Sequence, residues 1–336
     1  MSSPPSLLPC AHGITHTESR KGEHLAGAAP RPTACLERNT RRMYSKDAMI
    51  TRNRLIAKLT SYFLSRSDVA FAYLFGSWAK GYFQQHSDLD IAIYFYPAGG
   101  ELEVEDEVFY PGEDSIWADV DSISGTEVDL LVLNRAPARV GFAAISEGIS
   151  LRRDDNALFW KYALTAGHLF EEYADFTSSF LEIKARSLSL PAADKDRLLR
   201  TLDFLVAEIE DHSQFAEMDF QKYSKNSALR RNVERWIENQ VSASIDIAKI
   251  LISSEKQVIP QTYRDTVTRL KTLPGFDDQV VERISQNIRL RNFLAHEYLD
   301  IRFKHILRFV QDSPSPYREF VTIVKSFVSR EASDRN

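Results

Sequence analysis

Residues 49–154 alternate between short apolar runs and patterns with the period of a helix. Apolar runs of about four to eight residues bounded by glycine or proline are typical of buried strands, and apolar positions three and four apart are typical of helices. These patterns predict helices at 49–66, 77–84 and 138–148, and strands at 69–76, 88–96, 126–134 and 149–154. The order predicts an α+β domain at 49–154, a small mixed sheet with helices.

The remainder of the chain has almost only the helical period. A long pattern at 155–187 predicts a helical linker, 155–191, and the breaks at Pro260, Pro274 and Pro314 are typical of helix ends. Further helices are predicted at 192–219, 225–254, 260–272, 277–297, 301–311 and 316–330. We therefore expect an all-α helical bundle at 192–332 as a second domain.

Residues 1–48 have no sustained apolar period and are rich in proline, which predicts a disordered tail. The chain starts without a basic leading region or a long apolar core, so it makes a poor secretory signal. Both cysteines, Cys10 and Cys35, lie in this tail, which excludes a disulfide framework. The sequence lacks a run of about 18 apolar residues. We therefore expect a cytoplasmic protein that does not contact a membrane.

Negative charge is concentrated in one segment. The formal net charge of -5 argues against a generally basic surface for nucleic acid, although it allows a local basic groove. Residues 97–125 form an acidic excursion between two predicted strands, with nine carboxylates and no Lys or Arg at 101–121. This excursion could cover a site, repel nucleic acid, or be an inert loop.

The candidate chemistry of the first domain lies at strand ends. Gly76 and Ser77 close one strand and open a helix, where glycine lets the backbone approach a phosphate closely. Asp88 and Asp90 face the same side of the next strand, because residues two apart on a strand share a face. Asp129 lies in the following apolar strand.

Three carboxylates beside a phosphate-binding turn predict a two-metal nucleotidyl-transfer site. Mg²⁺ prefers oxygen ligands and leaves room for substrate phosphates, so Asp88, Asp90 and Asp129 are the predicted metal ligands. Asp129 could also accept the proton of the attacking hydroxyl. Glu127 shares a face with Asp129 and is a weaker candidate ligand. The alternative for Asp88 and Asp90 is a pair of aspartates at the start of a strand.

The order Gly-Ser, ten residues, Asp-x-Asp and a later Asp resembles the nucleotidyltransferase superfamily of DNA polymerase β. Over about 50–155 the domain looks most like the minimal nucleotidyltransferases, the MntA-type antitoxins. The resemblance implies that Gly76 and Ser77 bind the nucleotide, with ATP as the substrate and Mg²⁺ as the cofactor. The long acidic excursion at 97–125 departs from that family.

The second candidate site lies on the predicted helix 277–297. Apolar residues form one seam of this helix, and Arg291 and Tyr298 interrupt it. His296 is five residues from Arg291, about 140° around an ideal helix, so the two side chains of one straight helix would not converge. A local break or a second chain would bring such a pair together. Taken alone, Arg291 could pair with a carboxylate, and His296 could stabilise a helix C-terminus.

The string RNFLAHEY at 291–298 resembles the R-x4-H-x-Y motif of HEPN ribonucleases of the HepT toxin type. The resemblance implies a HEPN-like bundle that pairs as a homodimer or higher homo-oligomer and cleaves RNA, tRNA among the candidates, without a metal. His296 would be the acid or base, and Arg291 would stabilise the charged transition state. Basic residues could line the RNA path: Arg283, Arg289, Arg302, Lys304 and Arg308.

MntA-like and HepT-like proteins are usually separate partners, and the transferase adds AMP from ATP to the motif tyrosine. The resemblance therefore implies a fused toxin–antitoxin chain in which Tyr298 is modified. AMP there would add bulk and negative charge beside Arg291. One alternative is an antibiotic nucleotidyltransferase of the aminoglycoside type with a helical substrate domain. Another is a HEPN half that is only a dimerisation scaffold.

Overall fold

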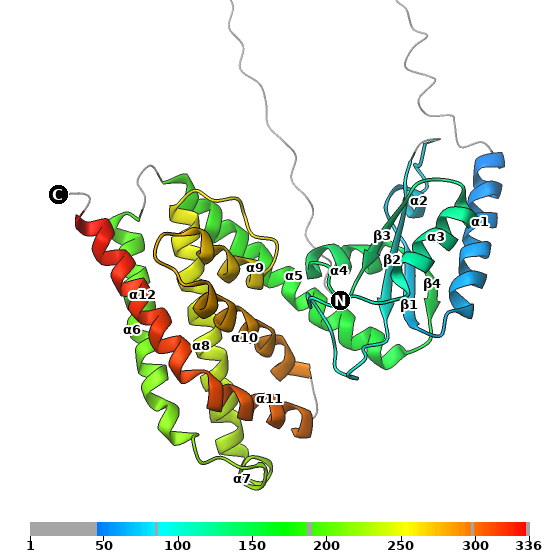
Figure 1. Ribbon diagram of the computed structural model, residues 1–336. Helices are drawn as coiled ribbons and strands as arrows, with labels where there is room; N and C mark the ends of the chain where they lie inside the picture. Colours follow the sequence, from blue (N-terminus) through cyan, green and yellow to red (C-terminus); the bar gives the residue numbers. More distant parts are fainter. Residues whose placement is uncertain (1–45, 85–86, 187–189, 297–298, 334–336) are drawn as a thin grey trace, which may run out of the picture. The chain divides into compact units, whose positions relative to one another are not determined.

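The computed structural model describes residues 46–84, 87–186, 190–296 and 299–333 (Figure 1). The first part is built on a four-stranded sheet in the order β3-β2-β1-β4. β1 pairs antiparallel with both β2 and β4, whereas β2 and β3 are parallel. The strands are β1 (Val69–Leu74), β2 (Leu89–Phe95), β3 (Val128–Val132) and β4 (Ile149–Arg153). The predicted mixed sheet is confirmed.

Helices cover both faces of this sheet. Alternate residues of β2 enter different clusters: Ile91 and Ile93 pack with the helices α1 and α3, and Ala92 and Tyr94 pack with α4 and the first half of α5. This is the alternation expected of a strand that is buried on both faces. The helices of this part are α1 (Lys46–Ser65), α2 (Gly76–Lys80), α3 (Glu113–Ser124) and α4 (Ala138–Glu147).

The structure differs from the predicted helices in several places: the helix predicted at 192–219 ends at Glu210, and Phe220–Lys225 forms a short helix that we did not predict. The acidic excursion at 97–125 contains α3, which we did not predict; Ile116 and Val120, one turn apart, are buried against the sheet. α1 begins at Lys46, so the predicted tail 1–48 includes the first residues of a helix. The rest of that tail lies outside the described residues.

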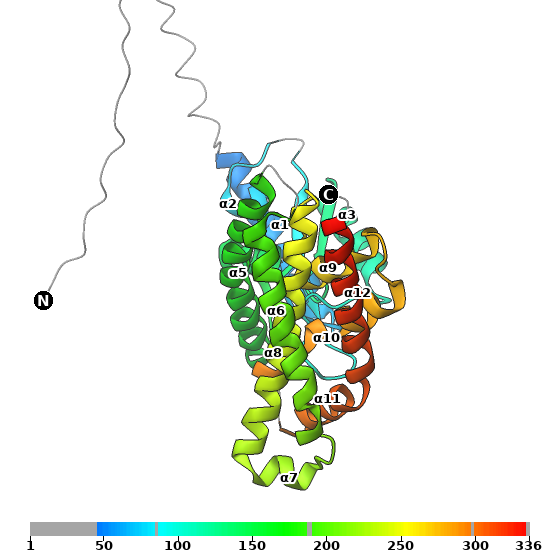
Figure 2. The ribbon, with the colours of Figure 1, turned by 90° about the vertical axis from the view of Figure 1, so that its left-hand side faces the viewer.

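The second part consists of helices around one apolar cluster, and α6, α8, α10 and α12 run beside one another (Figures 1 and 2). The predicted helical bundle is confirmed. Its α-helices are α6 (Ala192–Glu210), α7 (Phe220–Lys225), α8 (Ser227–Ser254), α9 (Tyr263–Thr268), α10 (Asp278–His296), α11 (Leu299–Asp312) and α12 (Pro314–Ser333). Two short 3-10 helices follow α6 and α9, at Asp211–Gln214 and Arg269–Thr272. Within the described ranges, no helix is both long and apolar enough to cross a membrane.

Helix α5 (Asn156–Ala185) belongs to both cores. Tyr162 and Leu169 in its first half are buried against the sheet, whereas Phe176 and Phe180 in its second half are buried in the helical cluster. Asp155 caps its start by accepting a hydrogen bond from the backbone N–H of Leu158. The segment predicted as a linker therefore also contributes buried side chains to the hydrophobic core of each part.

Candidate functional site

The predicted aspartates meet at one edge of the sheet. Asp90 of β2 lies directly opposite Asp129 of β3 in the parallel register, so both side chains are on the same face of the sheet. Asp88 immediately precedes β2 and is exposed, as is Asp129, whereas Asp90 is partly buried. Glu127 precedes β3 and is exposed. The sequence spacing and the strand pairing thus bring three carboxylates to one place.

The Gly76–Ser77 turn packs against one of these carboxylates. Gly76 has a φ of 65°, and a Cβ at this position would overlap the Asp90 carboxylate. The backbone N–H of Ser77 donates a hydrogen bond to that carboxylate, and the N–H of Phe75 donates to the Asp90 carbonyl at 2.9 Å. Glycine is therefore required for two reasons, the backbone conformation and the close approach of Asp90.

The three aspartates repel one another. Burial raises the pKa of the Asp90 carboxyl, and the charges of Asp129 and Asp88 raise it further. A cation would relieve this repulsion, and carboxylate oxygens are the donors that Mg²⁺ takes, so the residue types fit such an ion. Among the described residues, however, no three His, Cys, Asp or Glu side chains are arranged so that they could hold a metal ion as they stand. The ligand set therefore stays a prediction.

Arg291 lies at the edge of the apolar seam of α10. Val281, Ile284 and Ile288 of this seam are buried. The Arg291 guanidinium donates to both carboxylate oxygens of Glu172 on α5, at 2.8 and 2.6 Å, and it lies 5.4 Å from the ring centroid of Tyr263. Burial would lower the pKa of Arg291, but the hydrogen bonds and charge of Glu172 raise it above its usual value.

The other two residues of the motif are less fully described. His296 is the last residue of α10, but its side chain lies outside the described part, and so does Tyr298. Whether Arg291 and His296 converge is therefore still a prediction. The sequence did not reveal Glu172 as the partner of Arg291, because the two residues are 119 positions apart and neither stands in a recognisable motif with the other.

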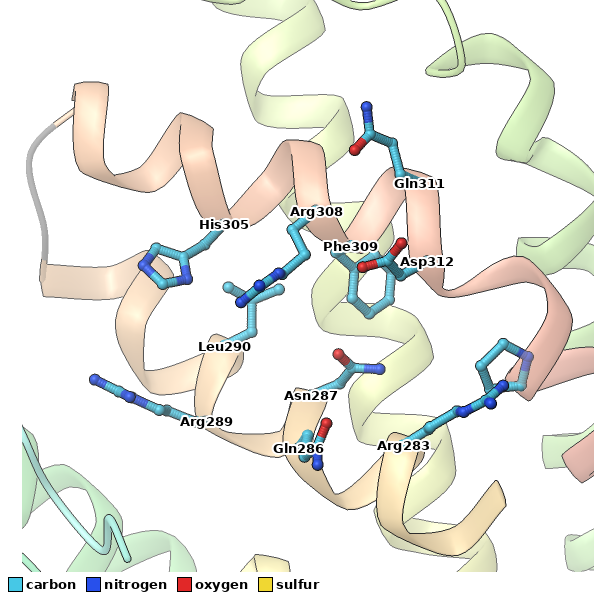
Figure 3. Close-up of a pocket in the computed structure, with 11 residues that line it drawn as sticks. Arg283, Gln286, Asn287, Arg289, Leu290, His305, Arg308, Phe309, Gln311 and Asp312 are labelled. Carbon is cyan, nitrogen blue, oxygen red and sulfur yellow. The ribbon is translucent and has the colours of Figure 1, made fainter. Parts of the chain in front are cut away.

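The predicted basic path divides into two groups. Arg283, Arg289 and Arg308 line a groove between α10 and α11 (Figure 3). Arg302 instead bonds Glu234 at 3.3 Å, and Lys304 is exposed without lining that groove. The sequence indicated these basic residues by charge alone, which does not say which of them share a face.

The fold agrees with comparisons to known families. The polymerase beta nucleotidyltransferase family model matches residues 57–157, and the ribonuclease HepT-like family model matches residues 205–324. The chain therefore joins a nucleotidyltransferase domain of the polymerase beta type to a HepT-like HEPN domain. The family assignments that the motifs suggested are confirmed.

Individual relatives cover one part of the chain each. The mRNA nuclease HepT of Shewanella oneidensis is 25% identical over 116 residues, which are 34% of this chain and 81% of that protein. A crystal structure of a mutant MntA–HepT toxin–antitoxin is 21% identical and covers 39% of this chain and 98% of that chain, with a TM-score of 0.36. The tri-AMPylated Shewanella oneidensis HEPN toxin in complex with MNT antitoxin is 20% identical and covers 38% and 96%, with a TM-score of 0.35.

Proposed function

We propose that this chain is a fused toxin–antitoxin protein. Its nucleotidyltransferase half transfers AMP from ATP to Tyr298, and the AMP silences a ribonuclease that uses Arg291 and His296. The observation that carries the first half of the proposal is the contact of the Gly76–Ser77 turn with Asp90, which lies opposite Asp129. The HepT-like family match supports the second half.

In the transfer, the hydroxyl oxygen of Tyr298 attacks the α-phosphorus of ATP. The bond from that phosphorus to the bridging oxygen of the β-phosphate breaks, and pyrophosphate leaves. Asp129 accepts the tyrosine proton, and the Gly76–Ser77 turn holds the nucleotide beside the aspartates. Asp88, Asp90 and Asp129 would hold Mg²⁺, which supplies positive charge against the triphosphate and the leaving group.

In the nuclease reaction, the 2′-hydroxyl of RNA attacks the adjacent phosphorus and the 5′-oxygen of the next nucleotide leaves. His296 moves the proton, and Arg291 stabilises the extra negative charge of the transition state. The five-residue spacing of the two residues favours a homodimer, in which two chains contribute to one cleft. An AMP group on Tyr298 would compete with the RNA phosphate for Arg291.

Mass spectrometry tests the transfer. The full chain, first shown to be unmodified, is incubated with ATP and Mg²⁺ and then digested. We expect an AMP-sized mass gain on the peptide that contains Tyr298. The gain should be absent in Asp88→Asn/Asp90→Asn and present in Asp114→Asn, which removes one exposed carboxylate of α3. The absence of a gain in the unmodified wild-type chain would refute self-modification and favour a small-molecule or separate protein acceptor.

One observation favours the scaffold alternative for the HEPN half: Arg291 already has a bidentate carboxylate partner, as a structural arginine would. RNA cleavage assays with the Asp88→Asn/Asp90→Asn variant, which should stay unmodified, distinguish an active ribonuclease from a scaffold. We expect Arg291→Ala or His296→Ala in that background to abolish cleavage. Cleavage that survives both substitutions, or that is absent from the start, would support a scaffold.

A further inference from the structure

A basic groove lies between α10 and α11, with a volume of about 710 Å³. Its charged lining consists of Arg283 and Arg289 from α10, His305 and Arg308 from α11, and the single carboxylate Asp312. Figure 3 shows the side chains of His305 and Arg308 extending from α11 toward α10. Basic side chains outnumber the single carboxylate in this lining, which favours the binding of anions.

Two of the arginines are available to a ligand. Arg283 and Arg308 are both exposed, and neither has an ion-pair partner among the residues that the structure describes. Exposed guanidinium groups bind phosphate oxygens bidentately and need little rearrangement to do so. The part of the groove at Arg283 and Arg308 is therefore open for an anionic ligand.

Carboxylates of the acidic excursion pair with two of the residues that line the groove, Arg289 and His305. Glu101 contacts His305 at 2.9 Å and Arg289 at 3.5 Å, and Asp106 contacts the Nε of Arg289 at 3.1 Å. These are the contacts that a phosphate oxygen would make with the same side chains. The excursion is therefore held at the groove by the groups that would recognise an anionic ligand.

These contacts leave one partner accessible to other anions. Arg289 is 44% exposed, so its guanidinium can reach a ligand from solvent. Asp106 is buried, and its Oδ2 has no hydrogen-bond partner among the described residues. Burial also raises the pKa of Asp106 to about 6, although Arg289 opposes that shift. The excursion thus holds a carboxylate in an unfavourable environment.

We propose that the groove between α10 and α11 binds the phosphates of an RNA strand, and that Glu101 and Asp106 compete with those phosphates for Arg289 and His305. This inference rests on the proposed ribonuclease function, because it takes the ligand to be the RNA substrate. The cations extend along α10, where Arg283 and Arg289 are about 9 Å apart along the helix axis. Such spacing suits the repeated phosphates of a strand better than one small anion.

Fluorescence anisotropy tests the basic part of the groove. The full-length protein is titrated into a fluorescein-labelled 2′-O-methyl RNA, which cannot be cleaved by attack of a 2′-hydroxyl. We expect Arg283→Gln/Arg308→Gln to bind about tenfold more weakly. A plot of the logarithm of the association constant against the logarithm of salt concentration has a negative slope. Its magnitude should decrease by about 1.4, since each single-strand phosphate contact contributes about 0.7. The control Lys304→Gln/Lys325→Gln, which removes two exposed charges outside the groove, should change affinity far less.

A second pair of variants tests the competition. Glu101→Gln/Asp106→Asn should bind the same RNA about threefold to tenfold more tightly, because the competing carboxylates are gone. Asp114→Asn/Glu171→Gln removes two exposed carboxylates elsewhere and serves as the control for net charge. An equal gain in both pairs would refute local competition.

The outcomes separate this inference from the proposed function. Suppose that AMP transfer and RNA cleavage occur normally but that Arg283→Gln/Arg308→Gln binds RNA with unchanged affinity. This result would refute RNA binding in the groove and leave the proposed function standing. If the wild-type chain gains no AMP but Arg283→Gln/Arg308→Gln binds RNA more weakly, self-modification is refuted and RNA binding in the groove is supported. Equal binding of single-stranded DNA, with the same loss in the variant, would overturn the assignment to RNA.

Discussion

Two glycines with left-handed backbone conformations differ in what surrounds them. Gly76 has a φ of 65° and packs against the Asp90 carboxylate, whereas Gly81 has a φ of 80° and would have nothing within 4 Å of an added Cβ. Alanine at either position takes on backbone strain of about 1–2 kcal/mol. Only at position 76 would the new methyl group also displace a residue of the candidate site.

We therefore expect Gly76→Ala to reduce AMP transfer more than tenfold, since Asp90 would have to move, while Gly81→Ala retains most of the activity. Both variants should lose similar free energy of unfolding from the strain itself. Transfer rates and urea unfolding of the two variants provide the comparison. Equal activity in both would mean that the approach of Asp90 to Gly76 has no part in the reaction.

Glu105 is a half-buried residue whose carboxyl connects the excursion to α4. It has a φ of 59°, and its side chain accepts a hydrogen bond of 2.8 Å from the backbone N–H of Ala138. Burial raises its pKa to about 7, against the opposing effect of that hydrogen bond. Because the folded-state pKa lies above the unfolded value, its favourable contribution is full below about pH 4 and is lost as the pH rises through 7.

The variant Glu105→Gln should therefore become more stable relative to the wild type as the pH rises. The amide oxygen can accept the same hydrogen bond, but it cannot ionise. We expect the difference in free energy of unfolding to grow by about 2 kcal/mol between pH 5 and pH 8. Denaturant titrations at the two pH values measure this difference, and a constant difference would show that Glu105 ionises normally in the folded chain.

At the scale of elements, helix α10 is joined to α5 by the Arg291–Glu172 pair. The two side chains are 26% and 23% exposed, so each loses much of its hydration. Removing one partner leaves the other charge partly buried without its bidentate partner, although Glu172 keeps His168 at 3.3 Å and Arg291 keeps the ring of Tyr263.

A double-mutant cycle measures this pair. We expect Arg291→Met and Glu172→Met each to lower the free energy of unfolding by about 2 kcal/mol, and the double variant to lose less than the sum. The coupling should be about 1–3 kcal/mol in denaturant unfolding experiments. A coupling near zero would show that Arg291 is held by its other neighbours, Tyr263 included.

The elements show how far the sequence alone can reach. The apolar runs of β1 and β2 predicted strands because burial on both faces leaves little room for polar residues. The motif Asp88-x-Asp90 placed two carboxylates at the start of one strand, and strand pairing then added Asp129. α3 was missed because the prolines, glycines and carboxylates around it obscured Ile116 and Val120, whose spacing of four was the available signal. Long-range pairs such as Arg291–Glu172 leave no local pattern.

At the scale of the whole molecule, α5 couples the two parts. Its buried residues change from one core to the other between Leu169 and Phe176. Ala174 lies between them and is exposed, so a substitution there can interrupt the helix without removing a core side chain.

We expect the wild-type chain to unfold in one transition and Ala174→Pro to unfold in two. Proline removes a backbone hydrogen bond and clashes with the preceding turn, at a cost of about 3 kcal/mol. Ala174→Gly, which costs only about 1 kcal/mol, should retain a single transition. Calorimetry distinguishes these cases, and a single transition in Ala174→Pro would show that the two parts are coupled by contacts other than α5.

The division of α5 also bears on synthesis at the ribosome. The chain is made from its N-terminus at about 5–20 residues per second, and domains generally fold as units. The buried face that α5 gives to the sheet, from Phe159 to Leu169, emerges before Arg291 and His296 exist. If the proposed function holds, the transferase can be complete several seconds before the nuclease it restrains. In that case, synthesis as a single polypeptide ensures that the inhibitory domain folds before the domain that it inhibits.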